Sequence, residues 1–217
     1  MTLKAIFFDH DDTLVGTIQA KWAQHKHVAK TFYNKTITDE QLRCHWGKSL
    51  SSIMQVLYET DDMDQAFVYN TAHRTQFPKQ LLSGTLETLG TLRNTHLRLG
   101  LVTGSTRSNL LHDFETLGIS STLFDYLQTE DDTPVHKPDP QVFNPTLQWL
   151  STQNILPHEV LYVGDHLNDL IAARGAGFHF LGVATGLITQ EEFEKHTAKA
   201  IPQLTNLLDF LKINSFK

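Results

Sequence analysis

Short apolar runs, separated by amphipathic stretches of helical length, recur through most of this chain and restrict its fold more than any other feature. The runs fall at residues 5–8, 97–102, 124–127, 160–163 and 178–183. Alternation of this kind implies βαβ units, in which parallel strands form one sheet covered by helices. We therefore predict an α/β fold built on a parallel sheet.

The alternation is interrupted after the first strand by a region that shows only helical patterns. Its helical stretches cover residues 20–32, 39–45, 50–58 and 63–77. We predict an all-helical cap domain at residues 17–82, inserted into a core domain formed by residues 1–16 and 83–217.

Turn-forming residues mark both ends of the insertion. Gly16 follows the first strand, and Pro78 and Gly84 precede the return of the sheet pattern. Both linkers would lie near the end of the first strand. We expect the cap to act as a lid there.

Two carboxylates stand directly after the first apolar run. Asp9 and Asp11 follow Ala5–Phe8, a run typical of a buried parallel strand. Open α/β sheets bind ligands at the carboxyl ends of their strands. Because the chain leaves the strand there, one carboxylate can attack a phosphate while the other transfers a proton. An acidic turn or helix cap is the alternative for this pair taken alone.

Polar groups also follow the second apolar run and begin a later helix. Thr103 and Gly104 offer a hydroxyl and free N–H groups that could hold a phosphate, although a simple helix cap would use the same residues. Lys137 precedes Pro138 in a stiff segment, with Pro140 in the first turn of the next helix. This segment indicates a positioned cation.

A second pair of carboxylates follows the strand predicted at residues 160–163. Asp165 and Asp169 come after Gly164, and their spacing of four would place both on one helical face. Their mutual repulsion requires a cation, and an oxygen-only ligand set suits Mg²⁺ better than zinc. A helix cap could explain either residue alone.

These segments resemble the four signatures of the haloacid dehalogenase superfamily, and they occur in the superfamily's order. The matching segments are Asp9-x-Asp11-x-Thr13, Thr103, Lys137-Pro138-Asp139-Pro140 and Gly164-Asp165-x-x-x-Asp169. The resemblance covers roughly residues 1–16 and 83–190 and implies a Rossmann-like core. The insertion looks like the helical cap of the subgroup that includes phosphoglycolate phosphatases, pyrophosphatases and β-phosphoglucomutases.

The resemblance implies a Mg²⁺-dependent phosphatase that hydrolyses a small phosphorylated metabolite through an aspartyl-phosphate intermediate. Asp9 would attack phosphorus, and Asp11 would act as acid and then as base. Thr103 and the N–H of Gly104 would hold the phosphoryl oxygens, whose charge Lys137 would offset. The expected ligands of Mg²⁺ are Asp9, Asp11, Asp165 and Asp169.

Three other functions compete with this one. A phosphomutase would use the same core, and Lys21 stands about where mutases carry a basic residue, although a lysine beside Trp22 is also typical of a helix surface. Carbon–halogen hydrolysis is disfavoured because such enzymes lack the second acid that Asp11 supplies. A binding protein that kept the fold is the third alternative.

Two residues depart from the superfamily's pattern. Asp12 stands where these enzymes often have glycine, and Asp is among the residues that tolerate a left-handed backbone. Gly16 stands where many relatives have Asp, so their hinge contacts cannot be assumed for this chain.

Composition excludes several other classes of function. The formal net charge is −6, and no basic block is long enough to follow a nucleic-acid backbone. No apolar run approaches the roughly 20 residues that span a membrane. The single Cys44 cannot form an internal disulfide. We expect a cytoplasmic protein that binds neither nucleic acid nor membrane; its oligomeric state is not predicted.

One segment of the cap is the candidate for substrate selection. Trp46, Gly47 and Lys48 join two predicted helices and bring together a ring, a turn and a cation. In relatives with such a cap, a glycine-containing segment of this kind faces the active site. The alternative is that Gly47 only ends a helix and Lys48 is solvated.

Overall fold

The structure, a computed structural model, describes residues 3–213 and divides into two compact units. The core consists of residues 1–16 and 80–217, and the cap of residues 17–79. The second boundary thus falls three residues before the one expected from the sequence. It does so because β3 (Gln80–Leu81) pairs antiparallel with β2 (Val15–Gly16), which joins both linkers to the core.

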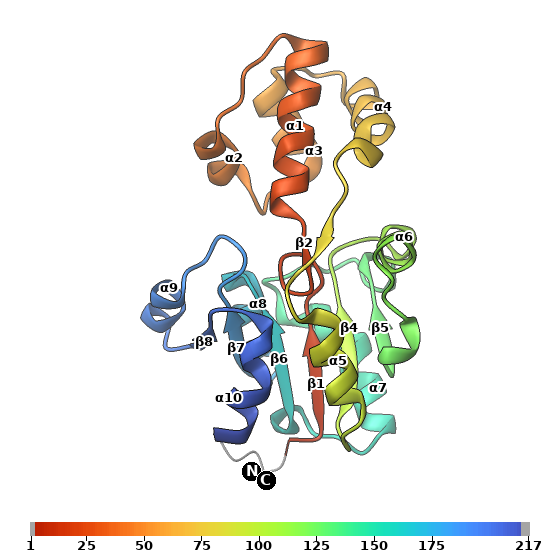
Figure 1. Ribbon diagram of the computed structural model, residues 1–217, viewed down its shortest axis with the longest axis vertical. Coiled ribbons are helices and arrows are strands. Elements are labelled where there is room, and N and C mark those ends of the chain that lie inside the picture. Colours follow the sequence, from red (N-terminus) through yellow and green to blue (C-terminus); the bar gives the residue numbers. More distant parts are fainter. Residues whose placement is uncertain (1–2, 214–217) are drawn as a thin grey trace. The chain divides into compact units, whose positions relative to one another are not determined.

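Six parallel strands form the sheet of the core, in the order β5-β4-β1-β6-β7-β8 (Figure 1). Their bounds are β1 Ala5–Phe8, β4 Arg98–Val102, β5 Tyr126–Gln128, β6 Val160–Gly164, β7 His179–Val183 and β8 Lys199–Ile201. Strand β1 lies between β4 and β6, so the residues that follow these three strands lie side by side.

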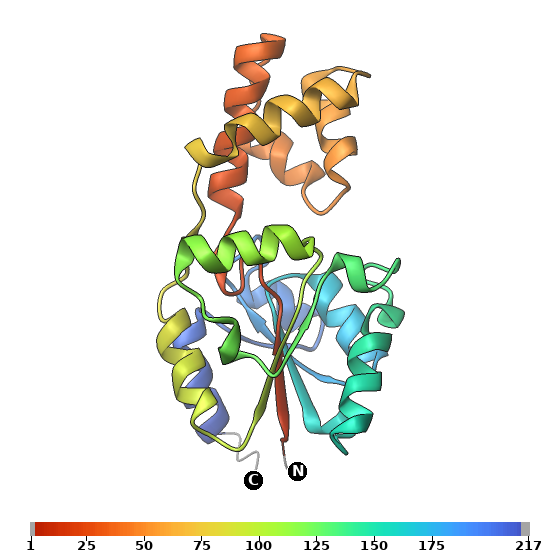
Figure 2. The same ribbon diagram turned by 90° about the vertical axis from the view of Figure 1, so that its right-hand side faces the viewer.

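Helices cover both faces of the sheet because the side chains of each strand alternate between them (Figure 2). Ile6 and Phe8 of β1 belong to a core cluster that also holds residues of α5 (Thr85–Arg93), α6 (Arg107–Leu117) and α10 (Leu207–Ile213). Ala5 and Phe7 belong to a second cluster with residues of α7 (Asn144–Thr152) and α8 (Leu167–Gly175). The predicted fold, a Rossmann-like parallel sheet flanked by helices, is confirmed.

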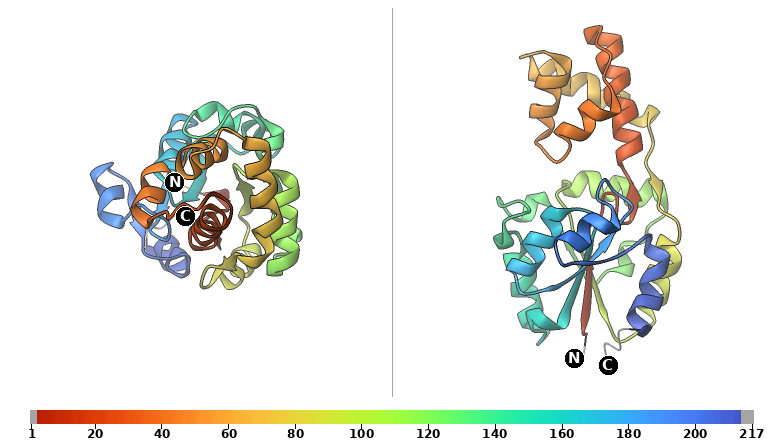
Figure 3. Two further views of the ribbon diagram at one scale, coloured as in Figure 1. Left: turned by 90° about the horizontal axis from the view of Figure 1, so that it is seen from above. Right: turned by 90° about the vertical axis from the view of Figure 1, so that its left-hand side faces the viewer.

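Two strands differ from the sequence prediction. Strand β5 begins at Tyr126 instead of Phe124, because a short 3-10 helix at Ser121–Leu123 ends at Phe124. Strand β8, at the edge of the sheet beyond α9 (Gln190–Lys195), was not predicted, because three residues carry too short a pattern (Figure 3).

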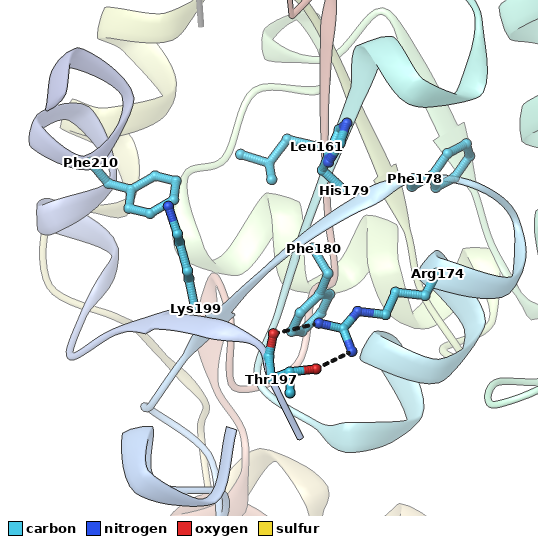
Figure 4. Close-up of a pocket in the computed structure, with 8 residues that line it drawn as sticks. All are labelled: Leu161, Arg174, Phe178, His179, Phe180, Thr197, Lys199 and Phe210. Carbon is cyan, nitrogen blue, oxygen red and sulfur yellow. Dashed lines mark hydrogen bonds between the residues drawn. The ribbon is translucent and has the colours of Figure 1, made fainter. Parts of the chain in front are cut away.

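A surface hollow of about 450 Å³ lies at the amino ends of β6, β7 and β8 (Figure 4). Arg174 closes one side, where its guanidinium donates to the backbone oxygens of His196 (2.9 Å) and Thr197 (2.8 Å). These bonds fix the end of α8 to the turn before β8. The predicted site residues follow the opposite, carboxyl ends of the strands, so this hollow is separate from them.

The cap is built of α-helices (Figure 1). They are α1 Ile18–Tyr33, α2 Asp39–His45, α3 Leu50–Tyr58 and α4 Met63–His73. Side chains of Thr38, Ser49 and Asp62 accept hydrogen bonds from backbone N–H groups in the first turns of α2, α3 and α4, which explains where these helices begin. The predicted fourth helix ends early, because residues 74–76 form a 3-10 turn.

Buried apolar residues from all four cap helices form its interior, among them Trp22, Leu42, Met54 and Ala66. Within residues 3–213, none of the helices combines the length and the apolar character that a membrane crossing requires.

Candidate active site

Asp9 ends the central strand and lies where the sequence analysis expected it. Its N–H donates to the carbonyl oxygen of Val163 at 2.9 Å, which continues the ladder between β1 and β6. The chain then turns sharply, and Asp12 adopts the left-handed conformation with φ +56°. The expectation that Asp replaces glycine here without harm to the turn agrees with this geometry. Thr185 also supports the turn by donating to the carbonyl oxygen of Asp12.

Lys137 connects three parts of the site. Its Nζ donates to Oδ1 of Asp9 at 2.6 Å, to Oδ1 of Asp169 at 2.6 Å and to the Tyr162 hydroxyl at 2.9 Å. The hydroxyl of Tyr162 donates in turn to the carbonyl oxygen of Val102 at 3.0 Å. Only 12% of the Lys137 side chain is exposed, so the two ion pairs are largely shielded from water.

Asp165 and Asp169 lie close together, but not on one helical face as their spacing predicted. Asp165 precedes α8 and does not share its helical face, because the helix begins at Leu167 with His166 as its cap. Asp169 lies in the first turn and accepts from the N–H of His166 at 3.1 Å. Thr13, from the turn after β1, donates to Oδ1 of Asp165 at 3.3 Å.

Two glycines allow the chain to close around these carboxylates. A Cβ at Gly164 would lie 2.7 Å from the carboxyl carbon of Asp169, and one at Gly186 would lie 1.9 Å from Oδ2 of Asp165. A larger side chain at Gly164 would therefore displace the carboxyl group of Asp169, and one at Gly186 would displace that of Asp165.

Burial sets the electrostatics of this group. Desolvation raises the pKa of Asp9 to about 7, and the charge of Asp169 adds to the rise while Lys137 opposes it. Desolvation, with the charges of Asp169 and Asp9, raises the pKa of Asp165 well above its usual range. Burial alone would lower the pKa of Lys137, but Asp169 and Asp9 raise it well above its ordinary value. One ammonium is thus held among three carboxylates.

The donor set of this group fits a hard divalent cation. Ligand atoms of Asp9, Asp165 and Asp169 lie within 4.8 Å of one another, and all three residues are buried. Carboxylate oxygens are the ligands that Mg²⁺ prefers. Its charge would offset the negative charges of Asp169 and Asp9, which add to burial in raising the pKa of Asp165. The carboxyl group of Asp11, which the sequence analysis also included among the ligands, belongs to a second group with His10 and Asp113.

The loop after β4 brings the predicted phosphate-binding residues beside Asp11. The N–H of Ser105 donates to the hydroxyl of Thr103 at 3.0 Å, which folds the loop back on itself. The hydroxyl of Ser105 donates to Oδ2 of Asp11 at 2.9 Å. A Cβ built at Gly104 would meet no other part of the chain within 4 Å, so the space on that side of the residue is open.

The cap segment predicted to select substrate contacts other residues of the cap. Trp46 ends α2 and sets its ring at 78° to that of Trp22, with centroids 6.0 Å apart. Gly47 has φ +86°, and Nζ of Lys48 lies 3.2 Å from Nδ1 of His45. These contacts define the turn, and the role of the segment in specificity stays a prediction.

Sequence reasoning missed Tyr162 and Ser105. Tyr162 lies in a strand that is otherwise aliphatic, and a buried tyrosine hydroxyl needs a partner, so its presence there was a usable signal. Ser105 gave no comparable signal, because a serine before a helix is commonly only a cap.

Comparison with known proteins gives consistent results. The family model described as haloacid dehalogenase-like hydrolase matches residues 6–183. The chain is 29% identical to pyrophosphatase PpaX of Bacillus pumilus over 199 residues, 90% of this chain and 89% of that protein. It is 28% identical to a phosphoglycolate phosphatase of Nitrosospira multiformis over 200 residues, 86% of this chain and 85% of the relative.

Solved structures share the fold over nearly the whole chain. A candidate haloacid dehalogenase-like hydrolase from Bacteroides fragilis matches with a TM-score of 0.78 and 26% identity, over 95% of this chain and 100% of its own. A candidate β-phosphoglucomutase from Thermotoga maritima matches with a TM-score of 0.80 and 22% identity, over 97% of this chain and 99% of its own. The family match spans well over half of the sequence and includes the strand ends that form the site. This chain therefore belongs to the haloacid dehalogenase-like hydrolase family.

Proposed function

We propose that this protein is a Mg²⁺-dependent phosphatase that hydrolyses a small phosphorylated metabolite through an aspartyl-phosphate intermediate. One observation carries the proposal: Lys137 is buried between Asp9 and Asp169, with Asp165 alongside, at the carboxyl ends of neighbouring strands. A buried group with excess negative charge is costly unless it binds a cation. A carboxylate, an ammonium and a cation together can hold and attack a phosphate ester.

The chemical steps follow from the residues at the strand ends. A carboxylate oxygen of Asp9 forms a bond to phosphorus while the bond to the leaving oxygen breaks. Asp11 donates a proton to that oxygen, then accepts one from the water that attacks the aspartyl phosphate and releases inorganic phosphate. Lys137 keeps Asp9 in place through the 2.6 Å contact and offsets the charge that develops on the phosphoryl group.

Thr103, Gly104 and the cation site complete the proposed machinery. The Thr103 hydroxyl and the Gly104 N–H would donate to phosphoryl oxygens. Asp9, Asp165 and Asp169 would hold Mg²⁺, which supplies positive charge that stabilises the transferred group. Asp11 is assigned to proton transfer, and its place among the Mg²⁺ ligands stays a prediction.

The names of the relatives suggest the class of substrate. Pyrophosphate and phosphoglycolate, the compounds in those names, each carry a second anionic group beside the phosphate that is removed. We infer that the substrate of this chain shares that feature. Lys48 of the cap is the proposed partner of the second anionic group.

Release of inorganic phosphate tests the proposal. The purified protein is assayed with p-nitrophenyl phosphate, pyrophosphate, phosphoglycolate and β-glucose 1-phosphate, with and without Mg²⁺. Phosphatase activity predicts free phosphate that disappears with EDTA and returns with Mg²⁺. Conversion of β-glucose 1-phosphate to glucose 6-phosphate without free phosphate would instead indicate a mutase, and activity that survives EDTA would refute the metal requirement.

A further inference from the structure

His10 stands between the two carboxylates at the end of β1, and the proposed mechanism gives it no role. Its side chain is completely buried, and Nε2 lies 3.1 Å from Oδ2 of Asp113 on α6. The Asp113 side chain is itself only 10% exposed. The ring of Phe114 covers the imidazole, with centroids 6.0 Å apart. A polar pair thus occupies a position in the core that an apolar side chain could fill.

The proton positions on His10 follow from its surroundings. An ionised carboxylate only accepts hydrogen bonds, so Nε2–H donates to Asp113. Nδ1 is buried, and it has no hydrogen-bond partner among the described residues. A bare nitrogen lone pair is cheaper to bury there than an unsatisfied N–H, so the arrangement with a proton on Nε2 and none on Nδ1 fits these contacts. The pair still carries a desolvation cost that an apolar residue would avoid.

The pair connects the turn after β1 to the helix that follows the phosphate-binding loop. Helix α6 begins two residues after Ser105, whose hydroxyl donates to Asp11 at 2.9 Å. Asp113 lies further along the same helix and binds His10. The segment 10–11 is therefore fixed to α6 and its preceding loop at two points.

Asp113 also lies close enough to Asp11 to influence it directly. Ligand atoms of His10, Asp11 and Asp113 lie within 4.8 Å of one another. Two carboxylates at this separation repel each other, and the Nε2–H of His10 holds one of them in a fixed direction. Loss of the imidazole would remove this hydrogen bond, so the Asp113 carboxyl group would be held less firmly beside that of Asp11.

We propose that His10 and Asp113 form a positioning pair that fixes the Asp11 carboxyl group beside the loop Thr103–Ser105 for proton transfer. The proposal rests on the proposed function, and specifically on Asp11 as the acid that protonates the leaving oxygen. It adds two residues to the machinery that touch neither the substrate nor the cation. Their effect reaches the reaction only through Asp11.

Substrates that differ in their need for an acid separate this role from a merely structural one. His10→Leu and Asp113→Asn are compared with the parent on phosphoglycolate and on p-nitrophenyl phosphate, whose leaving group needs little protonation. Release of the leaving group is timed in a single turnover, so that slow dephosphorylation does not mask the step. We expect His10→Leu to slow the alkyl phosphate about tenfold more than the aryl phosphate. Asp113→Asn can still accept a hydrogen bond from Nε2 of His10, so it should slow the alkyl phosphate less than His10→Leu does.

A double mutant and a matched control complete the test. In the Asp11→Asn background, His10→Leu should cause no further selective loss, because the group that it positions is gone. Leu110→Ala removes a buried apolar side chain from α6 and should lower stability while slowing both substrates alike. Equal losses on both substrates for His10→Leu and Asp113→Asn, or full additivity with Asp11→Asn, would overturn the positioning role.

The same data distinguish this proposal from the proposed function. If Asp11→Asn slows the alkyl phosphate no more than the aryl phosphate, the acid role of Asp11 is wrong and both proposals fail. If Asp11→Asn slows the alkyl phosphate more than the aryl phosphate, but the His10 and Asp113 variants slow both equally, only the positioning role fails. Should His10→Leu not fold, Asp113→Ala, which removes the other partner of the same contact, supplies the comparison.

Discussion

Both units bury a cluster of polar side chains, but the cluster in the core is charged and the one in the cap is neutral. In the cap, the Tyr58 hydroxyl donates to Oδ1 of Asn70 at 3.2 Å and lies 2.7 Å from Nδ1 of His25. Gln24 donates to the backbone oxygen of Asn70 at 2.6 Å. In the core, Lys137 is bound between Asp9 and Asp169 with Asp165 nearby.

The difference supports the proposal that the core cluster, and not the cap cluster, binds ligands. The cap network pairs donors with acceptors and carries no excess charge, since burial, with a smaller effect of Lys21, lowers the pKa of His25 to about 4 and keeps it neutral. The core cluster has three carboxylates for one ammonium, and burial raises the pKa of Asp9 and Asp165. A neutral, self-satisfied network stabilises a fold, whereas an unbalanced buried charge is retained where function requires it.

Replacing Asp9 should produce the largest effect and most clearly separate the two clusters. Asp9→Asn keeps the shape of the side chain but removes the attacking charge, so kcat on p-nitrophenyl phosphate should fall by at least about 1000-fold. Tyr58→Phe is the matched change in the cap. It removes a buried hydroxyl, should cost about 1–2 kcal/mol of stability and should leave kcat on this small substrate within about twofold. Near-normal turnover in Asp9→Asn would show that Asp9 is not the nucleophile.

The second prediction concerns the cation. Asp165→Ala should raise the Mg²⁺ concentration for half-maximal activity at least about tenfold, because one of the proposed ligands is lost. Asp125→Asn is the control, since Asp125 is a carboxylate paired with Arg93 and Arg98 at the amino end of β4. It should lower stability and leave the Mg²⁺ requirement unchanged. A similar Mg²⁺ dependence in parent and Asp165→Ala would contradict the proposed ligand set.

Local patterns predicted most of the fold because burial enforces them. The strand at residues 5–8 is fully buried, so its apolar run was unambiguous, and the helices at 39–45 and 50–58 have their predicted bounds because side-chain caps fix where they begin. Strand β8 could not be predicted, because its three residues are recognisable only once β7 offers a partner.

The site was predictable to the extent that its residues follow strands. Asp9, Thr103 and Asp165 each come directly after a strand, and parallel topology brings such positions together. The contacts of Asp11 could not be read from the sequence, because they depend on α6 crossing the end of β1, which places Asp113 near a residue more than 100 positions away. Long-range partners of this kind carry no local pattern.

The third prediction is a smaller effect on activity, and it concerns the turn Trp46–Lys48 of the cap. If Lys48 binds a second anionic group, Lys48→Ala should lower kcat/KM for the preferred metabolite about tenfold, which corresponds to about 1.4 kcal/mol, and leave p-nitrophenyl phosphate nearly unchanged. Lys35→Ala removes another cap lysine, one paired with Glu59, and serves as the control. A uniform change on both substrates, or none, would mean that Trp46, Gly47 and Lys48 only build the turn.

The smallest predicted effect is the dependence of cap stability on pH. The folded-state pKa of His25 is lowered from 6.5 to about 4, first by burial and then by Lys21. Between these two values the unfolded cap binds a proton that the folded cap does not, so stability is fully present above pH 6.5 and is lost as pH falls. From pH 6.5 to 5.5 the expected loss is about 1 kcal/mol.

Amide hydrogen exchange in α1 and α3 can measure this loss, because it reports opening of the cap without requiring the two units to unfold together. The matched variant is His25→Gln, which can still bond to Tyr58 but does not titrate. Its cap amides should lack the parent's extra loss of protection between pH 6.5 and 5.5, after correction for the intrinsic effect of pH on exchange. If parent and variant lose protection equally, His25 is not held neutral, and the contrast between a neutral cap network and a charged core cluster does not hold.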